Sequence, residues 1–194
     1  QDTSVGQSST EINKLLGAIG ATTRLNSDEM VDDVNNGGQT YRLYLENFNE
    51  ASPYTEGLVE GQKYSFYSGC SVLLDKAAVD AGKAEYLVKG FDSTYSIDSK
   101  TFGGNYTEIQ KGNAIALARE ELQNGANVFI SGTVFLSDFE IQVQLDNASD
   151  LEYSNKIVAK NILDSIRREL STSTIAEARA GELGEVFAVE GTVT

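Results

Sequence analysis

The side chains that could do chemistry in this sequence are mostly carboxylates. Asp and Glu number 29 against 15 Lys and Arg, and the sequence contains no histidine. The absence of histidine excludes Ser–His and Cys–His catalysis, histidine metal sites and imidazole acid–base chemistry. Two carboxylates could serve a glycosidase, but no pair stands in apolar surroundings. We therefore expect a protein that is not an enzyme and uses no cofactor.

Two groups of acidic and amide side chains have the composition of a calcium site but not its spacing. They are Asp28, Glu29, Asp32 and Asp33 in the first group, and Asp146, Asn147, Asp150 and Glu152 in the second. Neither group has the alternating oxygen ligands and central glycine of an EF-hand loop. We expect these side chains to be solvated and to hold no metal ion.

The single cysteine, Cys70, rules out an internal disulfide bond. It lies in the strand-like run 64–74, which favours a small buried side chain. An intermolecular bridge and a nucleophile are the alternatives. The sequence also has no glycine-rich phosphate loop of standard spacing.

The charge balance disfavours nucleic acid as a partner. The net charge is −14, and a surface for the phosphate backbone needs clustered Lys and Arg. The one adjacent basic pair, Arg167-Arg168, is followed at once by Glu169. No apolar run approaches the ~20 residues that span a bilayer, so we expect no membrane span.

The pattern of apolar residues predicts an α+β fold. It is strand-rich, a mainly antiparallel sheet or an OB-like barrel with a few short helices. Strands follow one another closely, without the regular rhythm of a parallel sheet. Alternation and turn residues predict strands over 40–45, 62–68, 71–74, 85–91, 128–135, 140–145 and 186–194. We divide the chain into a β-rich region, 1–111, with a flexible arm at 1–10, and a repeat region, 112–194.

Two helices are predicted from capping and periodicity. Ser8 and Glu11 have capping-box spacing, and an apolar stripe follows at Ile12, Leu15, Leu16 and Ile19. The amphipathic helix 155–170 is capped by Ser154. Its apolar stripe consists of Ile157, Val158, Ile162, Leu163, Ile166 and Leu170.

One unit occurs twice, at 114–135 and 174–194. Pairing the copies aligns Ile115 with Ile175, Arg119 with Arg179, and Gly132-Thr133-Val134 with Gly191-Thr192-Val193. Each copy predicts a short helix, a glycine turn and a strand. The helices are expected over 114–123 and 175–180.

Both copies resemble the opening of OB-fold-type modules of large secreted proteins, including extracellular nucleases of the endonuclease/exonuclease/phosphatase class. In such modules a short helix precedes the first barrel strand, and Gly-Thr-Val bends that strand. The resemblance implies that 140–145 is the next strand of the first module. The catalytic domain of those nucleases has no counterpart here, so the resemblance implies no nuclease activity.

The second copy ends with a strand after which no further strand is available to pair with it. Unpaired strand edges can join a neighbouring molecule. Together with a start at Gln1 rather than Met, this predicts a structural subunit that is exported or virion-associated. It would assemble with copies of itself into a filament or other homo-oligomer. The predicted contact residues are Phe187, Val189, Val193 and Val5.

The predicted location is extracellular or at the cell surface, with a virion as the alternative. The competing hypothesis is a ligand-binding, OB-like module of a larger secreted protein, with a glycan or a protein as its partner.

Overall fold

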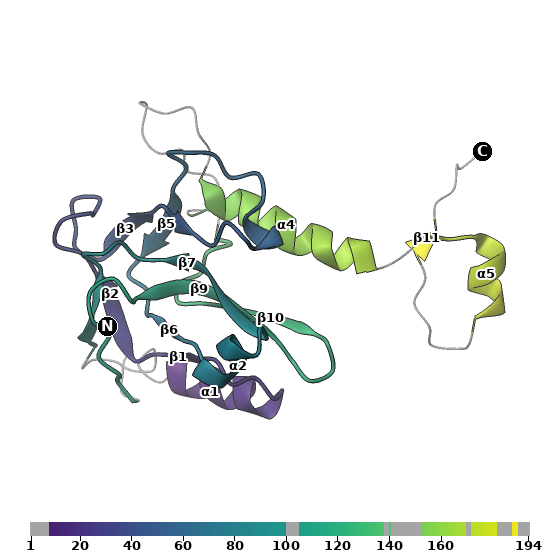
Figure 1. Ribbon diagram of the computed structural model, residues 1–194, viewed down its shortest axis with the longest axis horizontal. Coiled ribbons are helices and arrows are strands. Elements are labelled where there is room, and N and C mark those ends of the chain that lie inside the picture. The colour runs from purple at the N-terminus through teal and green to yellow at the C-terminus, as the bar shows by residue number, and fades with distance from the viewer. Residues whose placement is uncertain are drawn as a thin grey trace.

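The computed structural model describes residues 8–99, 105–137, 140, 153–169, 172–181 and 188–189. Its helices are α1 (Ser8–Ala18), α2 (Lys76–Asp80), α4 (Ser154–Glu169), α5 (Ile175–Ala180) and the short 3-10 helix η2 (Pro53–Thr55). Its strands are β1 (Arg24–Leu25), β2 (Asp28–Val31), β3 (Arg42–Leu45), β4 (Asn47–Phe48), β5 (Tyr64–Tyr67), β6 (Val72–Leu73), β7 (Ala84–Lys89), β8 (Tyr95–Asp98), β9 (Ile115–Glu121), β10 (Asn127–Ser131), β11 (Thr172–Ser173) and β12 (Ala188–Val189). The predicted α+β class is confirmed (Figure 1).

The largest sheet has the strand order β10-β9-β7-β4, and its neighbouring strands are antiparallel. β9 pairs on both sides, whereas β4 forms an edge. Three further antiparallel pairs, β1-β6, β2-β8 and β3-β5, surround this sheet. In Figure 1, α4 and α1 lie on opposite sides of the strands.

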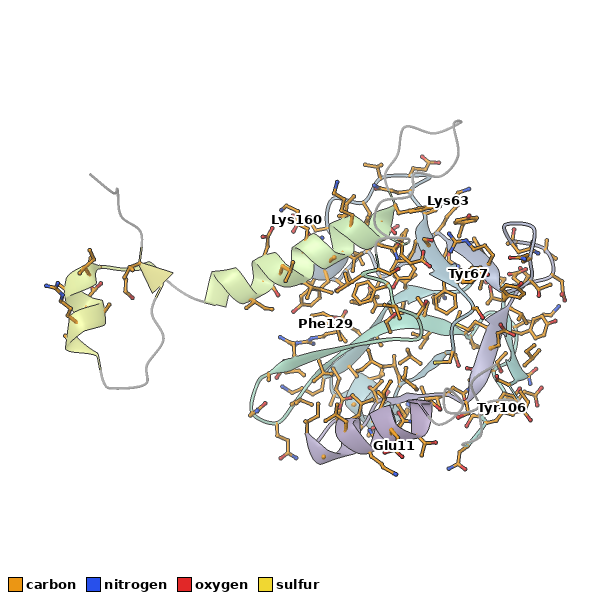
Figure 2. The ribbon with its side chains drawn as sticks, turned by 180° about the vertical axis from the view of Figure 1, so that it is seen from behind. Glu11, Lys63, Tyr67, Tyr106, Phe129 and Lys160 are labelled. Carbon is orange, nitrogen blue, oxygen red and sulfur yellow. The ribbon has the colours of Figure 1, made fainter. Side chains whose placement is uncertain are left out.

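The main hydrophobic core lies between β3, β5, β7, β9 and the first half of α4. Its fully buried members include Leu43, Leu45, Tyr64, Phe66, Leu87, Val88, Leu117 and Val158. A second cluster packs α1 onto β1, β6 and the β9–β10 hairpin. The side chains fill the space between the strands and the two helices (Figure 2). Burial of this apolar surface is the main force that holds the layers together.

The predicted helix over 114–123 is wrong, because Ile115–Glu121 forms β9 in the middle of the sheet. Its counterpart in the second copy, Ile175–Ala180, is helical as predicted. Thr174 and Glu177 form a capping box at the start of that helix. The first copy has Ala114 and Leu117 at the two matching positions, so it lacks the cap. Pairing with β7 and β10 then decides its structure.

The two other predicted helices are present, but their apolar stripes are only partly buried. In α1, Leu16 is buried, while Ile12 and Leu15 are exposed, and Ile19, directly after the helix, is exposed as well. In α4, Val158 is fully buried, while Leu163 and Ile166 are exposed. Figure 1 shows why: the second half of α4 extends beyond the strands that cover its first half.

The C-terminal part of the chain pairs with itself. β12 lies parallel to β11, with Ala188 opposite Thr172 and Val189 opposite Ser173. Within the predicted strand 186–194, residues 188–189 therefore have a pairing partner in their own chain. Of the predicted contact residues, Val189 is exposed, and Phe187, Val193 and Val5 lie outside the described residues.

Candidate functional site

Four carboxylates are buried: Asp28, Asp32, Glu120 and Glu140. The first two belong to the acidic group that we expected to be solvated, and the other two were not singled out from the sequence. Glu120 of β9 accepts hydrogen bonds from the backbone N–H groups of Thr22 and Thr23 and from the Thr22 hydroxyl, each at 2.8 Å. Desolvation raises the pKa of Glu120, but these bonds outweigh it and leave the pKa below its usual value. Its oxygens are engaged in holding the segment after α1 against the sheet.

Asp32 fastens two loops in the same way. One carboxylate oxygen accepts from the backbone N–H groups of Val34 and Asn35, and the other accepts from the hydroxyls of Ser93 and Thr94. Burial raises its pKa, and the four hydrogen bonds lower it further than burial raises it. Such a carboxylate is a poor general acid or base, because its charged form is already stabilised.

Asp28 and Glu29 point to different partners from Asp32. Asp28 accepts from the N–H and hydroxyl of Ser71, yet burial dominates and raises its pKa. Glu29 accepts from the Ser68 hydroxyl. The first acidic group therefore does not converge on one point, and no group of three or more candidate ligands able to hold a metal occurs among the described residues. The second acidic group lies outside them.

Arg42 and Glu140 form a buried ion pair with a nitrogen–oxygen distance of 3.2 Å. The guanidinium carbon of Arg42 also lies 4.8 Å from the centre of the Tyr44 ring and 5.4 Å from that of Tyr67. This cluster joins β3 to the region before α4, and we interpret it as structural.

Cys70 lies between β5 and β6, next to the β9–β10 hairpin, and is partly buried. Its thiol donates to the Gly132 carbonyl at 3.7 Å. Burial, with the nearby Asp28 carboxylate, raises the pKa of this thiol to about 12. The reactive form of cysteine is the thiolate, so this environment favours the structural interpretation of Cys70 over the nucleophile.

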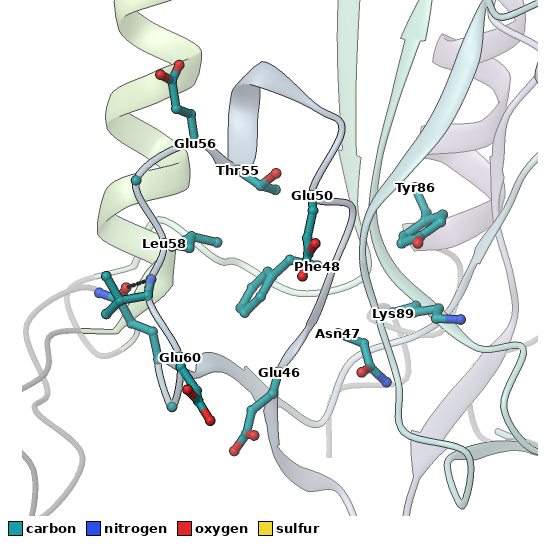
Figure 3. Close-up of a pocket in the computed structure, with 14 residues that line it drawn as sticks. Glu46, Asn47, Phe48, Glu50, Thr55, Glu56, Leu58, Glu60, Tyr86 and Lys89 are labelled. Atoms are coloured by element: carbon teal, nitrogen blue, oxygen red, sulfur yellow. Dashed lines mark hydrogen bonds between the residues drawn. The ribbon is translucent and has the colours of Figure 1, made fainter.

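A hollow of about 910 Å³ lies beside β4 and has no structural explanation among the described residues; we call it the β4 hollow. It is lined by β4, the segment 55–62 and two residues of β7. Figure 3 shows β4 on one side and the segment around Leu58 on the other. Carboxylates stand around it at Glu46, Glu50, Glu56 and Glu60.

Hydrogen bonds fix the segment that leads from β4 into the hollow wall. The Thr55 hydroxyl donates to the carbonyls of Asn49 and Ser52, at 2.6 and 3.0 Å. The Asn49 side chain donates to Glu85 of β7 at 2.8 Å. From α4, Asn161 donates to the carbonyls of Tyr54 and Glu56. The wall is therefore anchored both to the sheet and to α4.

The far wall of the hollow ends in a tight turn. The Gln62 N–H donates to the Val59 carbonyl at 3.1 Å, and the Gln62 side chain accepts from the Val59 N–H at 3.0 Å. Gly61 has a φ of 82°, which the third residue of a type II turn requires. The wall is thus held by its own backbone before any ligand arrives.

The hollow has an apolar floor at Phe48 and Leu58, and the rest of its lining is mostly polar and acidic. Phe48 and Leu58 are partly buried and pack against the main core. Glu50, Glu56 and Glu60 are exposed, and Glu46 lies 3.5 Å from Lys63 in an exposed ion pair. On the β7 side, the Lys89 ammonium lies over the Tyr86 ring, 5.6 Å from its centre. Apolar contact is available inside the hollow, and negative charge surrounds it.

The sequence did not reveal this site, because most of its lining lies between the predicted strands 40–45 and 62–68. The available signal was the recurrence of glutamate at 46, 50, 56 and 60 around two apolar residues. The sequence did not show that the segment 49–62 follows directly after an edge strand, β4.

No protein-family model and no curated protein matches the sequence. In structure, the chain is similar to the mmIFT52 N-terminal domain, with a TM-score of 0.48 and 16% sequence identity. The match covers 88% of this chain and 63% of that one, so the chain spans less than two thirds of that neighbour. This likeness concerns the fold alone.

That neighbour is by name a domain of an intraflagellar transport protein. It contradicts the predicted exported or virion-associated filament subunit and the predicted extracellular location, and we correct both. No helix within the described residues is long and apolar enough to cross a bilayer.

Proposed function

We propose that this chain is a non-catalytic protein-binding domain whose β4 hollow receives a basic segment of a partner protein. The observation that carries the proposal is the combination of a hollow of about 910 Å³, two apolar side chains at its floor, Phe48 and Leu58, and exposed carboxylates around it. The buried carboxylates described above are engaged by the chain's own donors, which supports binding rather than acid–base chemistry.

The negative charge around the β4 hollow favours a partner segment that is positively charged. Four glutamates and one lysine line the hollow, in a chain whose net charge is −14. A positively charged segment is attracted by the whole chain and most strongly here, whereas an acidic segment is repelled. The partner segment therefore carries Lys or Arg, with apolar side chains that reach Phe48 and Leu58.

A preformed wall lowers the cost of binding. Anchoring by Asn161, Thr55 and the Gln62 turn means that little of the wall has to be ordered when a ligand arrives. Burial of a few apolar side chains in the hollow supplies affinity, and the carboxylates supply selectivity.

The proposal is tested with the peptide Ac-Lys-Val-Lys-Val-Lys-NH2 and the full 194-residue chain, by isothermal titration calorimetry at low salt. The variant Glu50→Gln/Glu56→Gln/Glu60→Gln removes three exposed charges from the hollow. At about 0.5 kcal/mol for each exposed charge pair, the variant is expected to bind the peptide about tenfold more weakly.

The matched control is Asp92→Asn/Asp98→Asn/Glu108→Gln, which changes the net charge equally at exposed positions outside the hollow. We expect this control to bind within about twofold of the unmodified chain, since charges outside the hollow make no contact with the ligand and act on it only weakly through water. Equal weakening in the two variants would show that the peptide responds only to net charge and would contradict the proposal.

A further inference from the structure

We propose that the partner segment binds the β4 hollow as an added strand, by hydrogen bonding to the free edge of β4. This inference rests on the proposed function and specifies how the basic segment is held. It predicts that the ligand is recognised through its backbone as well as through its charge.

The register of the sheet shows that β4 has an open edge. In the part of the chain that the structure describes, β4 is the last strand of the four-stranded sheet, and no strand pairs with its outer edge. It pairs with β7 through Asn47 opposite Lys89 and Phe48 opposite Val88, and the Asn49 N–H donates to the Leu87 carbonyl at 3.0 Å. Residues of an antiparallel strand point their N–H and C=O groups alternately to the two sides. Since Asn49 bonds toward β7, the N–H and C=O of Phe48 point away from β7.

The hollow lies where a neighbouring strand would otherwise run. β3 and β4 follow one another directly in the chain, and β5 covers the edge of β3, from Arg42 opposite Tyr67 to Leu45 opposite Tyr64. The residues just before Tyr64 do not extend this ladder along β4. The Val59–Gln62 turn takes the chain away from β4 instead. The departure opens the β4 hollow, which is large enough for a short extended segment.

Side chains around this edge suit an alternating segment. In an added strand, side chains point alternately to the two faces of the sheet. One set can reach Phe48 and Leu58, which are only partly buried, and the other set can meet the glutamates. The alternating lysine–valine peptide meets both requirements, whereas a polyproline segment has no backbone N–H to donate.

The test compares Ac-Lys-Val-Lys-Val-Lys-NH2 with the same peptide N-methylated at every internal peptide nitrogen. Methylation keeps the lysine charges and the valine side chains but removes the backbone donors. We expect the methylated peptide to bind the full chain at least tenfold more weakly in calorimetry. Binding of both peptides within threefold would overturn strand addition while leaving the basic-ligand proposal intact.

A second readout uses the protein backbone itself. Hydrogen exchange followed by ¹H–¹⁵N NMR should show a Phe48 amide that exchanges readily in the free chain and at least tenfold more slowly with saturating unmodified peptide. A Phe48 amide that is already protected in the free chain, or unchanged by the peptide, contradicts an added strand. Failure of the unmodified peptide to bind at all would overturn both proposals.

Discussion

At the scale of single residues, the most consequential side chains are carboxylates that hold loops to the sheet. Glu120 reaches from β9 to the backbone at Thr22 and Thr23, and Asp32 joins the turn that follows β2 to Ser93 and Thr94. The sequence shows that acids are abundant but not which of them are buried. Burial depends on partners 61 to 98 positions away in the chain, which no local pattern reveals.

Replacing Glu120 with Gln should destabilise the chain by about 1.5–3 kcal/mol, because the two backbone donors lose a charged acceptor in a buried site. The neighbouring Glu121→Gln is the matched control. Glu121 is partly exposed and pairs with Lys83 and Arg119, so its loss should cost clearly less than the loss of Glu120. Urea unfolding followed by circular dichroism measures both, and equal costs would contradict the role assigned to Glu120.

The same carboxylate predicts a dependence of stability on pH. Because the folded-state pKa of Glu120 lies below its ordinary value of 4.5, its charge stabilises the folded chain above that value. The stability difference between the unmodified chain and Glu120→Gln should be complete near neutral pH. It should shrink as the pH falls through the folded-state pKa. Urea unfolding of both proteins from pH 7 to pH 3 checks this, and a difference that grows on acidification would contradict it.

At the scale of elements, similar sequences take different structures according to their surroundings. Ile115–Glu121 is a strand and Ile175–Ala180 is a helix, although the sequence aligns them. The capping box at Thr174 and Glu177 could be read from the sequence, and it favours the helix there. The strand arises from pairing with β7 and β10, which local propensity does not show.

The repeated Gly-Thr-Val motif has a packing role in the first copy. A Cβ atom on Gly132 would lie 1.6 Å from the Cys70 carbonyl oxygen, and the Cys70 N–H donates to the Gly132 carbonyl at 3.0 Å. Gly132→Ala should therefore destabilise the chain by about 3 kcal/mol. In Gly125→Ala the new methyl group meets open space at a φ of 83°, so about 1–2 kcal/mol is expected. Thermal unfolding ranks the two, and a reversed order would contradict the close approach.

The helix α4 is fastened to the body through its first half. Asn155 accepts from the Ser65 N–H at 2.7 Å and donates to the Ser65 carbonyl at 3.0 Å, and Val158 is fully buried. Val158→Ala should cost about 1.5–3 kcal/mol, through lost apolar contact and a cavity. Leu163→Ala should change stability by less than about 0.5 kcal/mol, because Leu163 is 62% exposed. Denaturant unfolding measures both, and a larger loss at Leu163 would mean that α4 packs differently.

At the scale of the whole molecule, the sequence predicts the α+β class, the antiparallel strands and the two longer helices. Each of these depends on local periodicity or capping. The β4 hollow could not be predicted from the sequence. It forms where the chain leaves the β3–β5 ladder next to the edge strand β4, and this arrangement depends on tertiary structure. The same limit applies to β12, whose pairing with β11 cannot be read from 188–189 alone.

The central claim is that the β4 hollow is where this acidic chain binds a basic segment, and a residue-resolved titration tests it most directly. In ¹H–¹⁵N NMR spectra of the full chain titrated with Ac-Lys-Val-Lys-Val-Lys-NH2, we expect the largest shifts at 46–50, 55–62 and 86–89. Shifts that centre instead on another acidic surface, such as that around Asp98 and Glu108, or that spread evenly over the exposed carboxylates, would contradict the claim.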